Sequence, residues 1–357
     1  MKTIHLIQFG LGGVGRAVVQ RVMASRDEFE WRYGLQLVYV AISDSRSAAI
    51  EPDGFSYAQL LTMMDVKAAG LSLADTEFGY DRGELTDIID VAGTDETIVI
   101  DVTATDDTSD ALLLALEMGY SAALANKKPL AGPYERFRDL TASGRLRYES
   151  TVGSGVPVIA TLRESIIASH DAVHRVEGCF SGTLGFLTTG LEEGRAFSEL
   201  VTEARALGYT EPDPRDDLGG MDVARKALIL ARTLGWPLEL EHIPVAPLFP
   251  PEMAAGSVED FMAALPQLDD LYRQKVAAAR DQDKTLRFVA ALSGGGASVG
   301  LQEVPIASAL GQLRGTDNII SFHTEVYNQT PLVLQGRGAG VHGTAAGVLA
   351  DIVALAV

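Results

Sequence analysis

The chain opens with an apolar run that leads directly into a glycine-rich turn and then into a helical pattern. Residues 3–9 read TIHLIQF, the turn reads GLGGVG, and the helical pattern continues as RAVVQRVMAS. A strand, a GxGxxG turn and a helix in this order let the backbone approach a pyrophosphate, which rests on the helix N-terminus. A tight glycine turn without a ligand is the alternative. We predict a doubly wound α/β sheet that binds a dinucleotide at Gly10, Gly12, Gly13, Val14 and Gly15.

A second apolar run, LQLVYVAIS at residues 35–43, predicts the next strand, and it ends at Asp44, Ser45 and Arg46. In this class of sheet, the residue at the tip of the second strand contacts the adenosine ribose. An acidic residue there favours NAD, whereas hydroxyls and an arginine accommodate the extra phosphate of NADP. Ser43, Ser45 and Arg46 favour NADP, and Asp44 leaves NAD open.

Later strands add polar residues at their carboxyl ends. IVIDV at residues 98–102 precedes Thr103, a helix is expected at 109–119, and the strand SAALA precedes Asn126 and Lys127. Ligands of doubly wound sheets bind at the carboxyl ends of the strands, so Thr103, Asn126 and Lys127 are expected near the cofactor. A lysine pair before a proline is also common in plain surface turns. Residues 56–90 predict one or two helices outside the sheet.

An acidic stretch, LGYTEPDPRDDLGGMDVARKALIL at residues 207–230, is the densest chemical signal in the chain. Its proline and glycine content predicts a fixed loop over residues 210–220 that leads into a helix starting near Met221 and ending at Gly235. The loop and the first helical turn carry carboxylates at Glu211, Asp213, Asp216, Asp217 and Asp222.

Lys226 follows Asp222 by four residues, so the two side chains share one helix face. Such pairs are usually solvated and contribute a few tenths of a kcal/mol. The apolar neighbours Val223, Ala227 and Leu228 nevertheless draw the lysine toward an apolar surface. A partly desolvated lysine has a lowered pKa and can exchange a proton near neutrality. Lys226 is therefore our candidate for proton transfer.

The remaining patterns predict a second domain and a return to the first. ESTVGSGV at residues 149–156 predicts a linker, and a strand at 174–180 precedes a glycine turn at Gly182 and Thr183. A helix at 197–207 is expected with Ser198 as its N-cap, followed by irregular proline-rich pieces, a hairpin at 285–304, a further strand, and a helix at 344–356. We predict a nucleotide-binding domain of residues 1–150 plus 335–357 and a second domain of residues 151–334.

Composition excludes several classes of function. The formal charge of −19 over 357 residues disfavours binding to nucleic acid or to an anionic membrane and suits a cytoplasmic protein. The apolar C-terminal stretch is too short to span a bilayer. Cys179 is the single cysteine, so no intrachain disulfide can form, and we expect a buried thiol rather than a nucleophile.

Seven motifs are spread over nearly the whole length of the chain: FGLGGVG, DVTAT, ALANKKPLAG, YESTVGSGVPVI, GTLGFL, GYTEPDPRDDLGGMDVARK and GRGAGVHGTAAGVLAD. On these motifs the chain resembles homoserine dehydrogenase, in a short monofunctional form without a kinase or regulatory domain. The resemblance implies a Rossmann-type domain and a second α/β domain for substrate binding and dimerisation. It also implies NAD(P)-dependent interconversion of L-aspartate 4-semialdehyde and L-homoserine, in threonine and methionine biosynthesis.

The resemblance further implies roles for individual residues. Lys226 would act as acid and base, and Lys127 would assist it. The substrate would contact Gly182, Thr183, Glu211, Asp216, Asp217 and Asp222, and the cofactor would also contact Gly340 and Thr344. A monovalent cation such as Na⁺ would be bound mostly by backbone oxygens around Glu149, Val152, Ser154 and Val156. The protein would be a homodimer.

Two other functions stay open. A related reductase would act on another amino-acid aldehyde or imine, and a catalytically idle NADP-binding sensor would bind the cofactor alone. A sensor predicts loss of the proton-transfer lysine, yet Lys127 and Lys226 are both present. A dehydrogenase that forms an acyl intermediate needs an activated cysteine, and Cys179 lies in no such motif.

Overall fold

The computed structural model describes residues 1–338 and 340–357, so Ala339 of the GRGAG motif lies outside the described residues. The chain divides into two compact units. Unit 1 comprises Met1–Gly155 and Gly340–Val357, and unit 2 comprises Val156–Ala339. Within the described residues, no helix combines the length and apolar character that a membrane span requires.

Unit 1 is built on a seven-stranded sheet with the order β4-β3-β2-β1-β5-β6-β7. Five strands are parallel: β1 (Lys2–Phe9), β2 (Leu35–Ser43), β5 (Thr97–Asp101), β6 (Ser121–Leu124) and β7 (Leu146–Arg147). The short strands β3 (Ser47–Ile50) and β4 (Gly79–Asp81) extend one edge in antiparallel pairing. Central strands with side chains buried on both faces are typical of a sheet covered by helices on both sides. The predicted Rossmann-type α/β class is confirmed.

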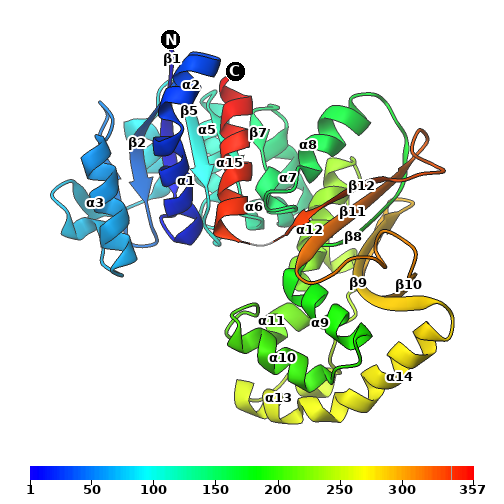
Figure 1. The fold of residues 1–357 in the computed structure, drawn as a ribbon. Helices are drawn as coiled ribbons and strands as arrows, with labels where there is room; N and C mark the ends of the chain where they lie inside the picture. Colours follow the sequence, from blue (N-terminus) through cyan, green and yellow to red (C-terminus); the bar gives the residue numbers. More distant parts are fainter. Residues whose placement is uncertain (339) are drawn as a thin grey trace. The chain divides into compact units, whose positions relative to one another are not determined.

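The helices of unit 1 connect these strands and cover the sheet (Figure 1). They are α1 (Gly13–Ala24), α2 (Arg26–Tyr33), α3 (Tyr57–Ala68), α4 (Leu85–Ala92), α5 (Ser109–Glu117), α6 (Lys128–Ala131), α7 (Tyr134–Thr141) and α15 (Val341–Ala356), with 3₁₀ turns η1 (Leu73–Asp75) and η2 (Glu149–Thr151). The C-terminal helix α15 lies beside α1, and Val348 and Ile352 join Val18 and Val22 in one buried cluster. The last segment of the chain therefore completes the core of unit 1.

Unit 2 contains a five-stranded antiparallel sheet with the order β10-β9-β8-β11-β12. Its strands are β8 (Val173–Cys179), β9 (Lys284–Ser293), β10 (Gly296–Pro305), β11 (Asp317–Thr324) and β12 (Leu332–Arg337). The predicted β9–β10 hairpin is confirmed, and it turns at Gly294 and Gly295, whose φ angles of 58° and 82° favour glycine.

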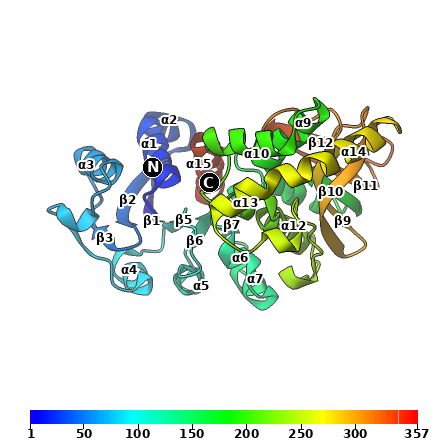
Figure 2. The same ribbon diagram turned by 90° about the horizontal axis from the view of Figure 1, so that it is seen from below.

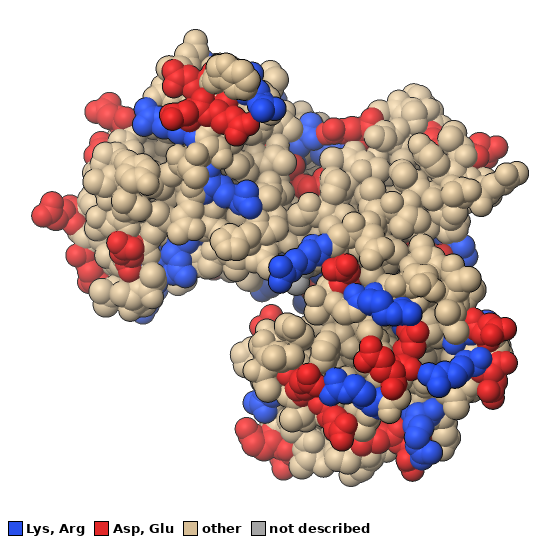
Figure 3. All heavy atoms as spheres, in the orientation of Figure 1, with Lys and Arg blue, Asp and Glu red and all other residues tan. Residues whose placement is uncertain are grey.

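Helices accompany this sheet, and Figure 2 shows α10, α13 and α14 side by side. Charged side chains of both signs gather over the helical part of this unit (Figure 3). The helices are α8 (Val158–Ala160), the π-helical segment η3 (Thr161–Ile167), α9 (Gly182–Glu192), α10 (Phe197–Ala206), α11 (Pro214–Leu218), α12 (Met221–Thr233), α13 (Val258–Ala264) and α14 (Asp269–Arg280), with 3₁₀ turns η4 (Leu240–His242), η5 (Pro251–Met253) and η6 (Leu265–Leu268).

The acidic segment differs from its prediction in one respect. Helix α12 begins at Met221 and is followed by Gly235 at φ 85°, as expected. The predicted loop over residues 210–220 is wrong at residues 214–218, which form α11. Proline is compatible with a first helical turn, because the N–H that it lacks has no helical partner there. Asp213 caps this helix by accepting a hydrogen bond from Arg215 N at 3.0 Å.

Two local predictions at helix starts are also wrong. Gly182 and Thr183 form the first turn of α9 rather than a glycine turn, and Ser181 caps it by accepting from Leu184 N at 3.3 Å. The N-cap of α10 is Ala196, not Ser198. The carboxylate of Asp269 accepts from both Ser198 N and Ser198 Oγ at 2.8 Å. A residue distant in sequence thus supplies the oxygen that a local cap would provide.

A buried arginine holds a long loop against the sheet of unit 2. Arg287 on β9 is 1% exposed, and its guanidinium pairs with Glu192 at 2.7 Å. It also donates to the carbonyls of Leu286, Leu310, Gly311 and Leu313. A buried charge is tolerated only when its donors are satisfied, and these carbonyls satisfy them.

We predict that Arg287→Met lowers the free energy of unfolding by about 3 kcal/mol, because Glu192 and the loop carbonyls lose their shared partner. Urea denaturation followed by circular dichroism measures this loss. Arg273→Met is the matched control, since Arg273 pairs with Asp270 at an exposed site on α14. If the urea midpoint of Arg287→Met is as high as that of Arg273→Met, Arg287 does not hold the loop against the sheet.

Candidate functional site

The glycine turn of unit 1 has the backbone geometry of a phosphate cradle. Gly10 has a φ angle of 99°, and a Cβ added at Gly15 would lie 2.2 Å from Gly10 O. Gly12 precedes α1 without a side-chain cap, and a Cβ there would meet no atom within 4 Å. The first N–H groups of α1 are thus left to a ligand, and an anion suits this end of the helix dipole. These residues fit a dinucleotide pyrophosphate.

A hollow of about 430 Å³ lies beside this turn, at the carboxyl ends of β1, β2 and β5. It brings together six of the predicted cofactor residues: Gly10, Gly12, Ser43, Asp44, Ser45 and Thr103. Gly13, Val14, Gly15, Arg46 and Asn126 do not line it. The sequence analysis missed two basic residues in its lining, Lys67 and Arg82. Lys67 lies near the end of α3 and Arg82 directly follows β4, so only the folded sheet brings them to the hollow.

Asp44, at the tip of β2, is occupied by partners inside the protein. Its Oδ1 accepts from Arg46 N and Ser47 N at 2.8 Å, and its Oδ2 lies 2.7 Å from Lys67 Nζ. Partial burial alone would raise the pKa of Asp44, but the hydrogen bonds from Lys67, Arg46 and Ser47 outweigh it and lower the pKa. The carboxylate therefore stays charged, and its charge is neutralised by Lys67.

A buried carboxylate organises the ends of β5 and β6. Asp101 Oδ1 accepts from Thr103 N at 2.9 Å, and its Oδ2 accepts from Thr108 Oγ1 at 2.7 Å and Asn126 Nδ2 at 3.0 Å. Burial raises the pKa of Asp101, although these hydrogen bonds oppose the shift. The Asn126 amide also donates to Thr105 O at 2.7 Å, and Asn126 is only 2% exposed. Its side chain is therefore bound by protein groups.

The start of α15 lies beside the glycine turn. Gly340, which precedes this helix, has a φ angle of 124°, and a Cβ added at Gly13 would lie 3.4 Å from Val341 Cγ2. Thr344 Oγ1 lies 2.9 Å from Ser154 Oγ. The predicted cofactor residues Gly340 and Thr344 thus begin a second helix next to the first.

The linker motif packs on the same helix. Glu149 N donates to Asp351 Oδ2 at 2.8 Å, and Ser150 Oγ donates to Thr344 O at 2.9 Å. Val152 is 1% exposed and Ser154 adopts a φ angle of 60°, while Val156, the first residue of unit 2, is 8% exposed. No cluster of three or more His, Cys, Asp or Glu side chains within the described residues could hold a metal ion. The cation site that the resemblance implies at this motif, mostly of backbone oxygens, stays a prediction.

In unit 2, the lysine of the acidic stretch is mostly covered and bound on two sides. Lys226 Nζ donates to Phe180 O at 2.7 Å and lies 2.8 Å from Asp222 Oδ2, with 13% of the side chain exposed. The predicted Asp222–Lys226 pair is therefore present. Phe180 directly follows β8 and precedes α9, so the ammonium group joins the start of α9 to the start of α12.

Thr183 and the acidic segment meet at a second group of contacts. Thr183 Oγ1 lies 2.6 Å from Tyr209 O and 3.2 Å from Asp217 Oδ1, and Asp217 Oδ2 accepts from Glu211 N at 2.8 Å. Burial raises the pKa of Asp217, and the charges of Glu211 and Asp222 raise it further against these hydrogen bonds. A cation bound here would stabilise the charged form of Asp217.

Four other residues named from the sequence occupy different surroundings. Glu211 and Asp216 are exposed, so their carboxylates are open to a ligand. Lys127 is half-buried at the start of α6 in unit 1. Burial raises the pKa of the Cys179 thiol to about 12, which keeps it protonated and excludes it as a nucleophile.

Family models match both units. A model of the homoserine dehydrogenase NAD-binding domain matches residues 10–149, and a homoserine dehydrogenase model matches residues 157–353. The chain belongs to the homoserine dehydrogenase family. This family comprises NAD(P)-dependent oxidoreductases, so the glycine turn and its hollow lie in the NAD-binding domain of the family.

Individual relatives agree with the family models. The homoserine dehydrogenase of Paracoccidioides brasiliensis is 35% identical over 99% of this chain and 97% of its own length. The bifunctional aspartokinase/homoserine dehydrogenase of Haemophilus influenzae is 34% identical over 98% of this chain, which spans 42% of that protein. The crystal structure of a putative homoserine dehydrogenase from Archaeoglobus fulgidus superposes with a TM-score of 0.79 and 26% identity, covering 98% of each chain.

Proposed function

We propose that this protein interconverts L-aspartate 4-semialdehyde and L-homoserine with a nicotinamide dinucleotide. The observation that carries the proposal is the covered Lys226 ammonium beside the acidic segment, in a chain of the homoserine dehydrogenase family. The bound cofactor supplies or accepts a hydride. The residues of this chain must then bind the amino acid, stabilise the alkoxide and move one proton.

Lys226 suits the proton transfer. Reduction of an aldehyde leaves negative charge on its oxygen, and a fixed ammonium group can stabilise and then protonate that oxygen. Phe180 O and Asp222 hold Lys226 Nζ in one position, so no ordering cost arises at the moment of reaction. In the oxidative direction, the neutral amine would accept the hydroxyl proton of homoserine. We assign Lys127 of the NKK motif an assisting role.

The acidic segment suits the ammonium group of the amino acid. Glu211, Asp216, Asp217 and Asp222 supply carboxylates, and the Asp217 pKa is raised in the absence of a cation. The first turn of α9, at Gly182 and Thr183, offers helix N–H groups that suit the substrate carboxylate. A zwitterionic substrate is therefore recognised at both of its charges.

We predict that Lys226→Met abolishes homoserine oxidation, lowering kcat at least a hundredfold, while the Kd for NADPH stays within about twofold. Absorbance of reduced nicotinamide measures turnover, and fluorescence titration measures binding. Lys275→Met, at an exposed lysine of α14, is the control.

Retained turnover in Lys226→Met would remove this residue from the mechanism. A wild-type protein that binds NADPH but does not oxidise homoserine would favour another amino-acid aldehyde or imine, or the sensor function.

We propose that the cofactor is preferentially NADP. Lys67 pairs with Asp44 and so occupies the carboxylate that would otherwise be available to the ribose of NAD. Arg82 lines the same hollow, and Arg46, two residues after Asp44, is exposed. Arg82 in the hollow and Arg46 outside it therefore supply the positive charge that would attract an adenosine 2′-phosphate.

Arg46→Ala should raise KM for NADP about tenfold and change KM for NAD less than twofold, because only NADP carries the 2′-phosphate. Steady-state kinetics with both cofactors measures the ratio. Arg32→Ala, on the surface of α2, should leave the ratio unchanged. Equal losses with both cofactors would show that Arg46 does not select between them.

Three finer properties are also proposed. A monovalent cation such as Na⁺ binds backbone oxygens around Glu149, Val152, Ser154 and Val156, so the melting temperature would rise in NaCl relative to choline chloride.

The second proposal is that the protein is cytoplasmic, which cell fractionation tests.

The third proposal is a homodimer formed through unit 2. The apolar residues Leu332, Val333 and Leu334 of the edge strand β12 are only half-buried, and an apolar edge strand is a template for pairing. Light scattering should give the mass of two chains, and the charged substitution Leu334→Lys should shift it toward one.

A further inference from the structure

The glycine turn of unit 1 rests on a buried side-chain amide. Gln8 is the penultimate residue of β1, and its side chain is fully buried. Its Nε2 donates to Gly10 O at 2.9 Å and to Gly15 O at 3.2 Å. These carbonyls belong to the first and last motif glycines, so one amide joins both ends of the turn.

The orientation of this amide follows from its surroundings. On its other side, the Tyr39 hydroxyl lies 3.0 Å from Gln8 Oε1, on a side chain that is 2% exposed. Two carbonyl oxygens require the NH₂ group to face them, because an amide oxygen in its place would be repelled. Oε1 must then face Tyr39, which donates the hydrogen bond. Burial raises the pKa of Tyr39, so the hydroxyl keeps the proton that it donates.

We propose that Gln8 and Tyr39 are positioning residues that hold the glycine turn in its dinucleotide-binding conformation. Gly10 lies at φ 99° and has no side chain to fix its peptide. Without the Gln8 donor, the Gly10 carbonyl loses this partner, and its peptide is free to rotate beside the phosphate position. The free protein then samples conformations that do not bind the cofactor, which weakens the apparent affinity.

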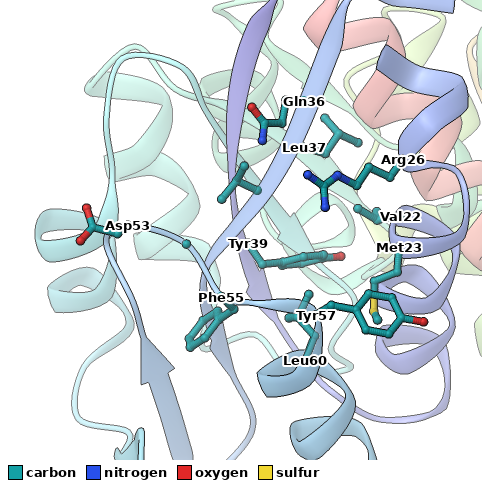
Figure 4. Close-up of a pocket in the computed structure, with 12 residues that line it drawn as sticks. Val22, Met23, Arg26, Gln36, Leu37, Tyr39, Asp53, Phe55, Tyr57 and Leu60 are labelled. Atoms are coloured by element: carbon teal, nitrogen blue, oxygen red, sulfur yellow. The ribbon is translucent and has the colours of Figure 1, made fainter. Parts of the chain in front are cut away.

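The inference rests on dinucleotide binding by unit 1 and is independent of the substrate. Figure 4 shows Tyr39 extending from β2 toward Met23 of α1, along a hollow of about 230 Å³. Neither Gln8 nor the motif glycines line this hollow. Removing only the Tyr39 hydroxyl therefore tests the hydrogen bond to Gln8 with the aromatic ring still in place.

Three variants separate the hydrogen bonds from simple packing. Gln8→Met keeps the length of the side chain without donors, and Gln8→Glu places an oxygen against the two carbonyls. We expect the Kd for NADPH, from fluorescence titration, to rise about tenfold in Gln8→Met and further in Gln8→Glu. Tyr39→Phe should raise it a fewfold. The kcat at saturating cofactor should stay within about twofold, so the change appears in KM for the cofactor.

Tyr272→Phe in unit 2 is the matched control, because the Tyr272 hydroxyl is also buried and donates to Leu248 O. It should lower the melting temperature and leave the Kd for NADPH unchanged. If the Kd for NADPH is also unchanged in all Gln8 and Tyr39 variants, measured well below their melting temperatures, the inference is overturned. Absence of NADPH binding in the wild type would overturn the cofactor assignment itself. Binding without homoserine oxidation would overturn only the proposed reaction.

Discussion

The Lys226 ammonium, bound by a backbone carbonyl and a carboxylate, is the interaction around which the chemistry of unit 2 is arranged. A mostly covered charge is stable only when partners offset its lost hydration. Phe180 O and Asp222 provide these partners at 2.7 and 2.8 Å. Because Phe180 precedes α9 and Asp222 lies in the first turn of α12, the same contacts join the starts of these two helices. The catalytic candidate is therefore also a structural link, and its position is set before any substrate binds.

Asp44 in unit 1 and Asp217 in unit 2 have pKa values shifted in opposite directions, which suits them to different roles. Asp44 has a lowered pKa because Lys67 and nearby N–H and O–H groups satisfy its charge within unit 1. Asp217 has a raised pKa because burial and neighbouring acids disfavour its charge. A satisfied carboxylate has little to gain from a ligand, whereas Asp217 gains from a cation. This difference distinguishes an acid that shapes a cofactor hollow from one suited to an amino-acid ammonium group.

Sequence alone predicted the elements whose signals are local. β2, α12 and the β9–β10 hairpin follow from apolar patterns bounded by glycine, and the Asp222–Lys226 pair follows from helical spacing. The same reasoning missed β3 and β4, which are short and contain little apolar periodicity, and it missed β11 and α14. At α11 the local proline signal favoured a loop, although a proline at a helix start carries no penalty.

The contacts that sequence reasoning missed share a different cause, since each joins residues distant along the chain. Lys67 reaches Asp44, Arg287 reaches Glu192 and the carbonyls of a later loop, and Gln8 receives Tyr39. Two of them leave a trace in the sequence, because Gln8 and Arg287 interrupt the strongly apolar strands TIHLIQF and TLRFVAAL. A polar side chain in a buried strand must find partners, so it marks a place where another segment is held. At Gln8 that segment is the glycine turn, which connects a buried hydrogen bond to the affinity for the cofactor.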